Sequence, residues 1–184
     1  MSDTKSLHYQ LCLEGARWLH RRKYDYNKCQ TKECRKPEFC RVCQPYKYVA
    51  VEINTYGVEQ TDVWGWNGYL TSIIEVKTSH ADFLNDKKKL CRQDTYKDLQ
   101  CGNLRWYLCP EGVIKPEELP ENWGLLYWNG KKISHVVAPK HIDCSYKGDM
   151  FVIYSILRRE NIKGKVYNYR GTNDTIKPKV IYES

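Results

Sequence analysis

The sequence lacks any apolar run as long as the ~18 residues that a membrane-spanning helix needs. Its start, MSDTKSLHYQ, has no basic segment followed by an apolar stretch, so we expect no signal peptide. It also has no internal repeat. These absences favour an intracellular, cytoplasmic protein without a membrane partner. The 184 residues, 41% hydrophobic and 28% charged, suit one globular domain.

The nine cysteines are odd in number, and with no export signal a disulfide framework is not expected. Four of them stand close together in CQTKECRKPEFCRVC, at Cys29, Cys34, Cys40 and Cys43. Four thiolates are enough for one tetrahedral structural Zn²⁺ site, while ordinary reduced thiols and an iron–sulfur cluster stay open as alternatives. The scattered remainder are expected to be buried as small apolar residues; they are Cys12, Cys91, Cys101, Cys109 and Cys144.

Positive charge is concentrated in one segment of this chain, whose net charge is +8. Ten lysines and arginines stand between Arg17 and Lys47, against three acidic residues. Such a segment fits a polyanion partner such as DNA, although a solvated surface would have the same composition. The cations that interleave the four cysteines are predicted to grip a phosphate backbone; they are Lys28, Lys32, Arg35, Lys36 and Arg41.

Hydrophobic periodicity predicts a mixed α/β sheet with helices on its faces, in a domain over residues 1–164. The predicted elements are a helix over 4–22, strands over 46–54, 60–66 and 71–78, a helix over 79–93, a strand over 104–110, a hairpin over 124–137 and a helix over 150–161. Ser79 is the expected N-cap of the second helix. A Cys-rich insert occupies 24–47, and a polar tail occupies 165–184.

The stretch TDVWGWNGYLTSIIEVKTS, residues 61–79, holds the candidate catalytic residues. A hairpin with a four-residue loop over 67–70 pairs Trp66 with Thr71 and Asp62 with Glu75, which puts both acids on one side of the sheet. Lys77 points to that side too, because it stands two residues beyond Glu75. Opposed carboxylates repel unless a divalent cation lies between them. A surface cluster of acids and a lysine is the alternative.

Together these features resemble the PD-(D/E)XK nuclease superfamily. They are Asp62, the triplet Glu75-Val76-Lys77 across a hairpin, and a preceding helix that bears Glu14. The run EVKTSHADFLNDKK, the strand LRWYLCP and the later GLLYW resemble in particular its MmcB-like branch, which is associated with DNA repair. The likeness extends over about residues 7–138. It implies a restriction-endonuclease-like αβββαβ core, binding of a divalent metal and cleavage of nucleic acid.

The resemblance also implies roles for individual residues. Asp62 and Glu75 would be ligands of Mg²⁺ or Mn²⁺, Lys77 the catalytic lysine, and Glu14 a further acidic residue that supports the metal or the water. Asp82, Asp86 and Lys87 would line the adjacent helix, with Lys87 near the nucleic acid. This chain departs from the family pattern in having Thr61 before Asp62, and in its Cys-rich insert.

These features predict a divalent-metal-dependent nuclease that hydrolyses DNA phosphodiester bonds, in repair, restriction or a mobile-element setting. The alternative is a non-catalytic DNA-binding repair accessory that keeps the nuclease-like fold. Trp64 and Trp66 lie on the side of Asp62 in this register, where they would line a cleft or pack on the first helix. No metal-ligand spacing is assigned to four of the histidines, His8, His20, His135 and His141.

Overall fold

The computed structural model describes residues 6–21, 44–160, 165–168 and 179–183. Most of the Cys-rich insert lies outside these ranges. The predicted zinc ligands Cys29, Cys34, Cys40 and Cys43, and the predicted phosphate-binding residues Lys28, Lys32, Arg35, Lys36 and Arg41, are therefore not among the described residues. They stay predictions.

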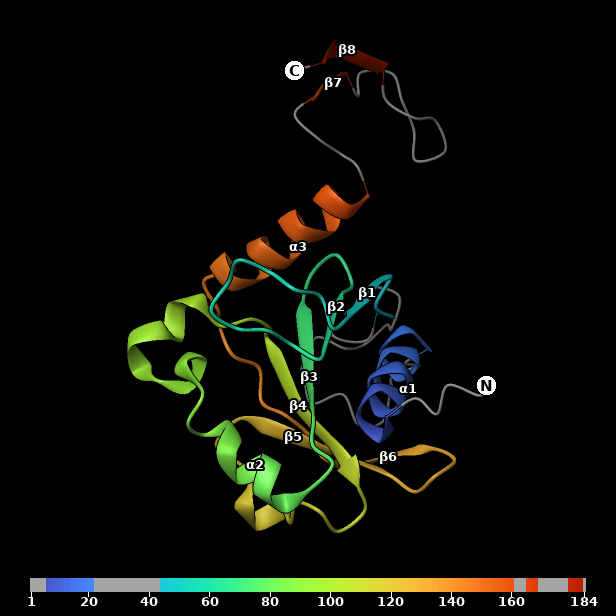
Figure 1. Ribbon diagram of the computed structural model, residues 1–184, viewed down its shortest axis with the longest axis vertical. Helices are drawn as coiled ribbons and strands as arrows, with labels where there is room; N and C mark the ends of the chain where they lie inside the picture. Colours follow the sequence, from blue (N-terminus) through green and yellow to red (C-terminus); the bar gives the residue numbers. More distant parts are fainter. Residues whose placement is uncertain (1–5, 22–43, 161–164, 169–178, 184) are drawn as a thin grey trace, which may run out of the picture.

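The described elements begin in the order helix, three strands, helix, strand (Figure 1). The α-helices are α1 (Leu7–Arg21), α2 (His80–Asp86) and α3 (Lys147–Arg159). The strands are β1 (Tyr48–Val51), β2 (Val63–Trp66), β3 (Thr71–Val76), β4 (Leu104–Pro110), β5 (Trp123–Trp128), β6 (Ile133–Val137), β7 (Lys165–Asn168) and β8 (Lys179–Glu183). Short 3₁₀ helices are η3 (Leu90–Arg92), η4 (Asp94–Leu99) and η5 (Pro116–Glu118).

Six strands form one mixed sheet in the order β1-β2-β3-β4-β5-β6. The two pairs in its centre, β3 with β4 and β4 with β5, are parallel, whereas β1-β2, β2-β3 and β5-β6 are antiparallel. Helices flank the sheet (Figure 1), as the periodicity predicted. Strands β7 and β8 pair separately within the segment that the sequence marks as a polar tail.

Helix α1 covers one face of the sheet with an apolar stripe. Leu11, Cys12 and Leu19 are fully buried there against side chains of β2, β3, β4 and β5. Gly15 lets the helix backbone come close, since an added Cβ would lie 3.2 Å from both Ile74 Cδ1 and Leu108 Cδ2. This position of α1 brings His8, in its first turn, close to Asp62, the residue just before β2.

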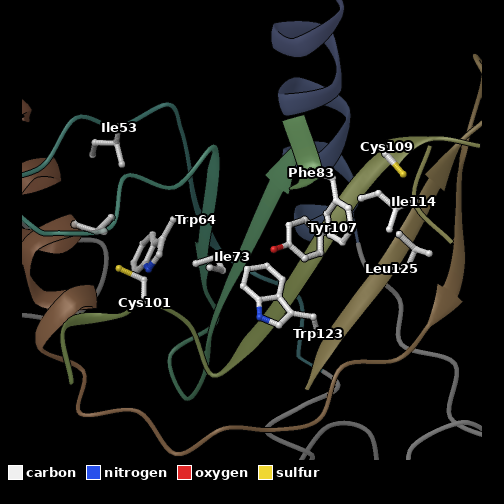
Figure 2. Packing of buried hydrophobic residues seen from close by; sticks show 11 residues of the cluster. Ile53, Trp64, Ile73, Phe83, Cys101, Tyr107, Cys109, Ile114, Trp123 and Leu125 are labelled. Carbon is white, nitrogen blue, oxygen red and sulfur yellow. The ribbon is translucent and has the colours of Figure 1, made fainter. Parts of the chain in front are cut away.

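The opposite face carries the second apolar core, which is rich in aromatic rings (Figure 2). Tyr107 on β4 is at its centre, with its ring 4.3 Å from that of Trp123 in a stacked arrangement and 5.1 Å from that of Phe83 edge-on. Phe83 belongs to α2, and Val152 of α3 is buried in the same cluster. Because β3 is covered on both sides, all six of its residues are buried.

A buried carboxylate, Asp149, anchors α3 to this second face. Its oxygens accept hydrogen bonds from Trp64 Nε1 at 2.7 Å, Thr71 Oγ1 at 2.9 Å and the Gly102 backbone N–H at 3.2 Å. Burial raises the pKa of Asp149 and these donors partly offset that rise. The expectation that Trp64 packs on α1 or lines a cleft is wrong, because its indole N–H pairs with Asp149 beneath α3.

Helix α2 is shorter than the predicted helix over 79–93. It starts as expected, with Ser79 Oγ accepting from the Asp82 backbone N–H at 3.2 Å, but it ends at Asp86. The chain then turns through η3, which lets Lys89 and Arg92 reach back to Asp86. These ion pairs at a buried carboxylate are formed in place of two further helical turns.

No helix in the described part of the chain is both long and apolar enough to cross a bilayer.

Candidate active site

The hairpin of β2 and β3 forms in the predicted register. Trp66 pairs with Thr71 and Val63 with Ile74, and the four-residue loop closes with the Asn67 backbone N–H donating to Leu70 O at 3.2 Å. Asn67 Oδ1 also accepts from two backbone N–H groups of the loop, which explains an Asn at this turn. The next position of this register belongs to Asp62 and Glu75, and the negative charge of Asp62 acts on Glu75.

Glu75 and Lys77 lie together on the same side of β3, as predicted. Lys77 Nζ is 3.4 Å from Glu75 Oε2, and both side chains are buried, at 3% and 0% exposure. Ile74 and Val76 point into the α1 core on the other face. The alternation of a strand therefore separates the charged pair from the apolar pair, although β3 is closed to water on both faces.

Glu75 is part of a buried ion cluster drawn from several segments. Its carboxylates belong to Glu59, Glu75 and Asp86, and its cations to Lys77, Lys89, Arg92 and Arg105. Lys89 Nζ bridges two of the acids, at 2.6 Å from Glu75 Oε2 and 2.8 Å from Asp86 Oδ1. Lys77 Nζ is 3.0 Å from the same Asp86 oxygen.

Arg92 is the centre of this ion cluster. Its guanidinium contacts Glu59 through Nη1, donates to Asp86 Oδ2 through Nε at 2.9 Å and faces Glu75 Oε1 through Nη2 at 3.8 Å. Stacking on an aromatic ring holds its plane, with Cζ 4.7 Å from the centre of the Trp123 ring. A planar, delocalised cation suits three carboxylates in one buried place better than a lysine would.

The two neighbouring carboxyls Glu75 and Asp86 share cations but differ in acidity. Burial and the charge of Asp62 raise the pKa of Glu75 to about 7, against the lowering effects of Lys89, Arg92 and Lys77. Burial acts in the same direction on Asp86, yet Arg92, Lys89 and Lys77 hold the pKa of that carboxyl well below its usual range. The difference follows first from the complete burial of Glu75 and then from the negative charge of Asp62, which together outweigh the cations at Glu75 but not at Asp86.

Asp62 is held between β3 and α1. Its Oδ2 accepts from the Val76 backbone N–H at 2.7 Å, and its Oδ1 lies 3.5 Å from His8 Nε2. The other ring nitrogen of His8 lies 3.6 Å from Cys12 Sγ and 3.4 Å from Glu52 Oε1. Burial, then Asp62 and Glu52, raise the pKa of the Cys12 thiol.

The remaining predicted residues lie in other surroundings. Glu14 pairs with Arg17 on its own helix, and the α1 residue that reaches Asp62 is His8. Lys87 is exposed at the end of α2, with Nζ 6.0 Å from the centre of the Phe83 ring. Asp86 turns inward to the ion cluster and accepts from Tyr107 Oη at 2.7 Å.

Sequence reasoning missed four members of the ion cluster, which are Glu59, Lys89, Arg92 and Arg105. Lys89 and Arg92 follow α2 in the run KKKLCR, where Lys89 stands three residues after Asp86, a spacing that could have marked it. Glu59 lies in the connection between β1 and β2, and its Oε2 accepts from the Cys101 backbone N–H at 2.6 Å. No local pattern marks a contact between segments so far apart in sequence.

The arrangement offers two chemical features in one place. Asp62 and Glu75 hold facing positions in the hairpin register, and the charge of Asp62 acts on Glu75. One oxygen of Glu75, Oε1, is buried without a hydrogen-bond partner among the described residues. Beside them, Lys77 and Lys89 are ammonium groups that could stabilise negative charge that develops on a phosphate. A site of this kind can bind a cation through its acids or an anion through its bases.

No protein-family model matches this chain, and no curated protein matches it. A solved structure, the SPO1766 protein of unknown function from Silicibacter pomeroyi, is similar to it at 18% sequence identity with a TM-score of 0.45. The similarity covers 68% of this chain and 83% of that one.

Proposed function

We propose that this protein is a divalent-metal-dependent nuclease that hydrolyses DNA phosphodiester bonds, with a restriction-endonuclease-like core. The observation that carries the proposal is the hairpin register, which aligns Asp62 beside Glu75, together with Lys77 Nζ at 3.4 Å from Glu75. The order of the first elements, helix, three strands, helix and strand, supports it, because this is the αβββαβ order that the PD-(D/E)XK resemblance implies.

The acidic pair fits a hard divalent cation. Glu75 Oε1 is a buried carboxylate oxygen that makes no hydrogen bond within the described chain, although Arg92 Nη2 faces it at 3.8 Å. Burial and then the negative charge of Asp62 raise the pKa of Glu75. Both observations are those expected of ligands whose counterion is a metal. Asp62 and Glu75 would hold Mg²⁺ or Mn²⁺, which would polarise the phosphoryl group and lower the pKa of a water molecule.

Lys77 and Lys89 have different parts in this proposal. The Lys77 ammonium is 3% exposed and fixed between Glu75 and Asp86, so it orients the attacking water and stabilises the charge that develops on the phosphate. Lys89 has 41% of its side chain exposed, so its ammonium can leave Glu75 for solvent or for a DNA phosphate. Lys87 and the basic insert complete the proposed DNA-binding set, whereas Glu14 is paired with Arg17 on α1 and is left out of the catalytic set.

The direct test is cleavage of plasmid and single-stranded DNA by the full-length protein. With Mg²⁺ or Mn²⁺ present we expect nicked or linear plasmid, or shortened single strands, on gels; after chelation by EDTA we expect intact DNA. Addition of excess Mg²⁺ to the chelated sample should restore cleavage, which controls for damage by EDTA. Intact DNA under every metal condition would contradict the proposal.

A second candidate function is that of a non-catalytic DNA-binding repair accessory. It is favoured by the 2.6 Å contact between Lys89 Nζ and Glu75 Oε2, since an ammonium there already neutralises the acid. Calorimetric titration with Mn²⁺ separates the two functions. If the protein is a nuclease, the wild type should bind Mn²⁺ more tightly than Glu75→Gln does. If it is an accessory, it should bind DNA, and the wild type and Glu75→Gln should have equal affinity for Mn²⁺.

The cleavage rate is expected to depend on the protonation of Glu75. The pKa of this carboxyl is raised to about 7, so below that pH Glu75 is protonated in most copies of the protein. A protonated carboxyl is a poor metal ligand. At a subsaturating Mg²⁺ concentration the rate should rise about tenfold per pH unit below 7 and level off above it. Rates measured from about pH 5 to about pH 9 would contradict this assignment if they did not change.

A further inference from the structure

Side chains of α1 and of the β1–β2 connection form a second cluster of possible ligands on the other side of Asp62. One nitrogen of His8, the sulfur of Cys12 and one oxygen of Asp62 all lie within 4.8 Å of one another. His8 and Cys12 stand four residues apart on α1, so they lie on the same helix face one turn apart. Glu52 Oε1 is 3.4 Å from His8 Nδ1.

We propose that His8, Cys12 and Asp62 form a binding site for Zn²⁺ or a similar borderline transition-metal ion. Bond lengths of about 2.0–2.3 Å to nitrogen, oxygen and sulfur in a tetrahedral site put ligand atoms about 3.3–3.8 Å apart. The separation of Cys12 Sγ and His8 Nδ1, 3.6 Å, already lies in this range. Asp62 Oδ1 lies 3.5 Å from the other ring nitrogen, Nε2, so a tetrahedral ion requires the His8 ring or the Asp62 side chain to turn.

The chemistry of the donors selects the metal. A thiolate and an imidazole suit Zn²⁺, whereas Mg²⁺ takes oxygen ligands, so this site differs in kind from the carboxylate pair of the proposed nuclease. Cys12 is fully buried, while His8 and Asp62 keep 35% and 21% of their side chains exposed. The two partly exposed residues can therefore meet an ion from solvent.

Charge also favours a cation at this site. Asp62 and Glu52 face the two nitrogens of His8, and the cations of the ion cluster contact Glu75, Asp86 and Glu59. The described side-chain partner of these two carboxylates is therefore an imidazole, while Asp62 Oδ2 also accepts from the Val76 backbone N–H at 2.7 Å. Glu52 stands next to the open side of the site, and its carboxylate could complete the four ligands. The proposal goes beyond the nuclease; it shares Asp62 with the proposed nuclease site, but its test by Zn²⁺ binding does not depend on whether the chain cleaves DNA.

The test is calorimetric titration of the metal-free, full-length protein with Zn²⁺. We expect His8→Gln and Cys12→Ala each to lose one equivalent of bound Zn²⁺, or to raise its Kd at least ~100-fold. Any zinc taken by Cys29, Cys34, Cys40 and Cys43 is common to all forms, so the difference between variants is the result that counts.

Three controls match these changes. His20→Gln alters another histidine of α1, Cys109→Ala removes another fully buried thiol, and Glu75→Gln alters the proposed nuclease site. All three should keep the wild-type Zn²⁺ stoichiometry and Kd. If Cys12→Ala does not fold, His8→Gln decides, because its side chain is partly exposed. Unchanged binding by His8→Gln would overturn the proposal and make His8 an imidazole that only bridges two carboxylates.

Discussion

Glu75→Gln is expected to lower the rate of DNA cleavage at least ~1,000-fold while the protein stays folded. The amide keeps the shape of the side chain but loses the negative charge that Mg²⁺ or Mn²⁺ requires of a ligand. It also leaves Asp62 without its neighbouring acid across the hairpin. Single-turnover cleavage of a labelled DNA duplex, with circular dichroism as the check on folding, measures the effect.

A matched control makes this result specific. Glu111→Gln carries the same change at an exposed position just after β4, and it should cleave at the wild-type rate. Lys77→Met removes the fixed ammonium and keeps an apolar stem in its place, so it should lose activity as well. Cleavage by Glu75→Gln at the wild-type rate would remove Glu75 from catalysis.

Arg92→Ala is expected to lower the free energy of unfolding by about 3–5 kcal/mol. The guanidinium faces Glu59, Asp86 and Glu75 from one buried place, and its removal leaves carboxylates that are 0–1% exposed without their shared counterion. A typical domain has only about 5–15 kcal/mol in total, so the variant should be close to unfolding at moderate temperature. Urea unfolding followed by tryptophan fluorescence measures the change.

The control for this loss is Arg17→Ala. Arg17 pairs with Glu14 on the surface of α1 and is 55% exposed, so its removal should change the free energy of unfolding by no more than about 0.5 kcal/mol. Equal stability of Arg92→Ala and Arg17→Ala would mean that the buried carboxylates take up protons or water at little cost. That outcome would contradict the role given to Arg92.

The hairpin was predictable because its determinants are local. The four residues from Asn67 to Leu70 set the register, and the period of two in β3 then fixes which side chains share a face. Strand β4 also begins and ends where the sequence predicts. In each case neighbouring residues alone decide the conformation.

The ion cluster was not predictable because its contacts join distant segments. Glu59 and Arg92 are 33 residues apart, and nothing near either one marks the other as its partner. The short α2 fits the same contacts, since Arg92, six residues after Asp86, would point away from it on a continued helix, whereas Lys89 is at a helical spacing of three. The His8–Cys12–Asp62 cluster was predictable in part. The spacing of four between His8 and Cys12 on a helix is visible in the sequence, whereas their closeness to Asp62 depends on the fold.

The ion cluster has a consequence for how the protein opens to solvent. It ties the β1–β2 connection to β3, to the end of α2 with η3, and to β4 through Arg105. A fluctuation that freed one of these segments would have to hydrate several charges at once, which is costly in the interior. Their backbone amides are therefore expected to exchange hydrogen with water as one cooperative unit rather than segment by segment.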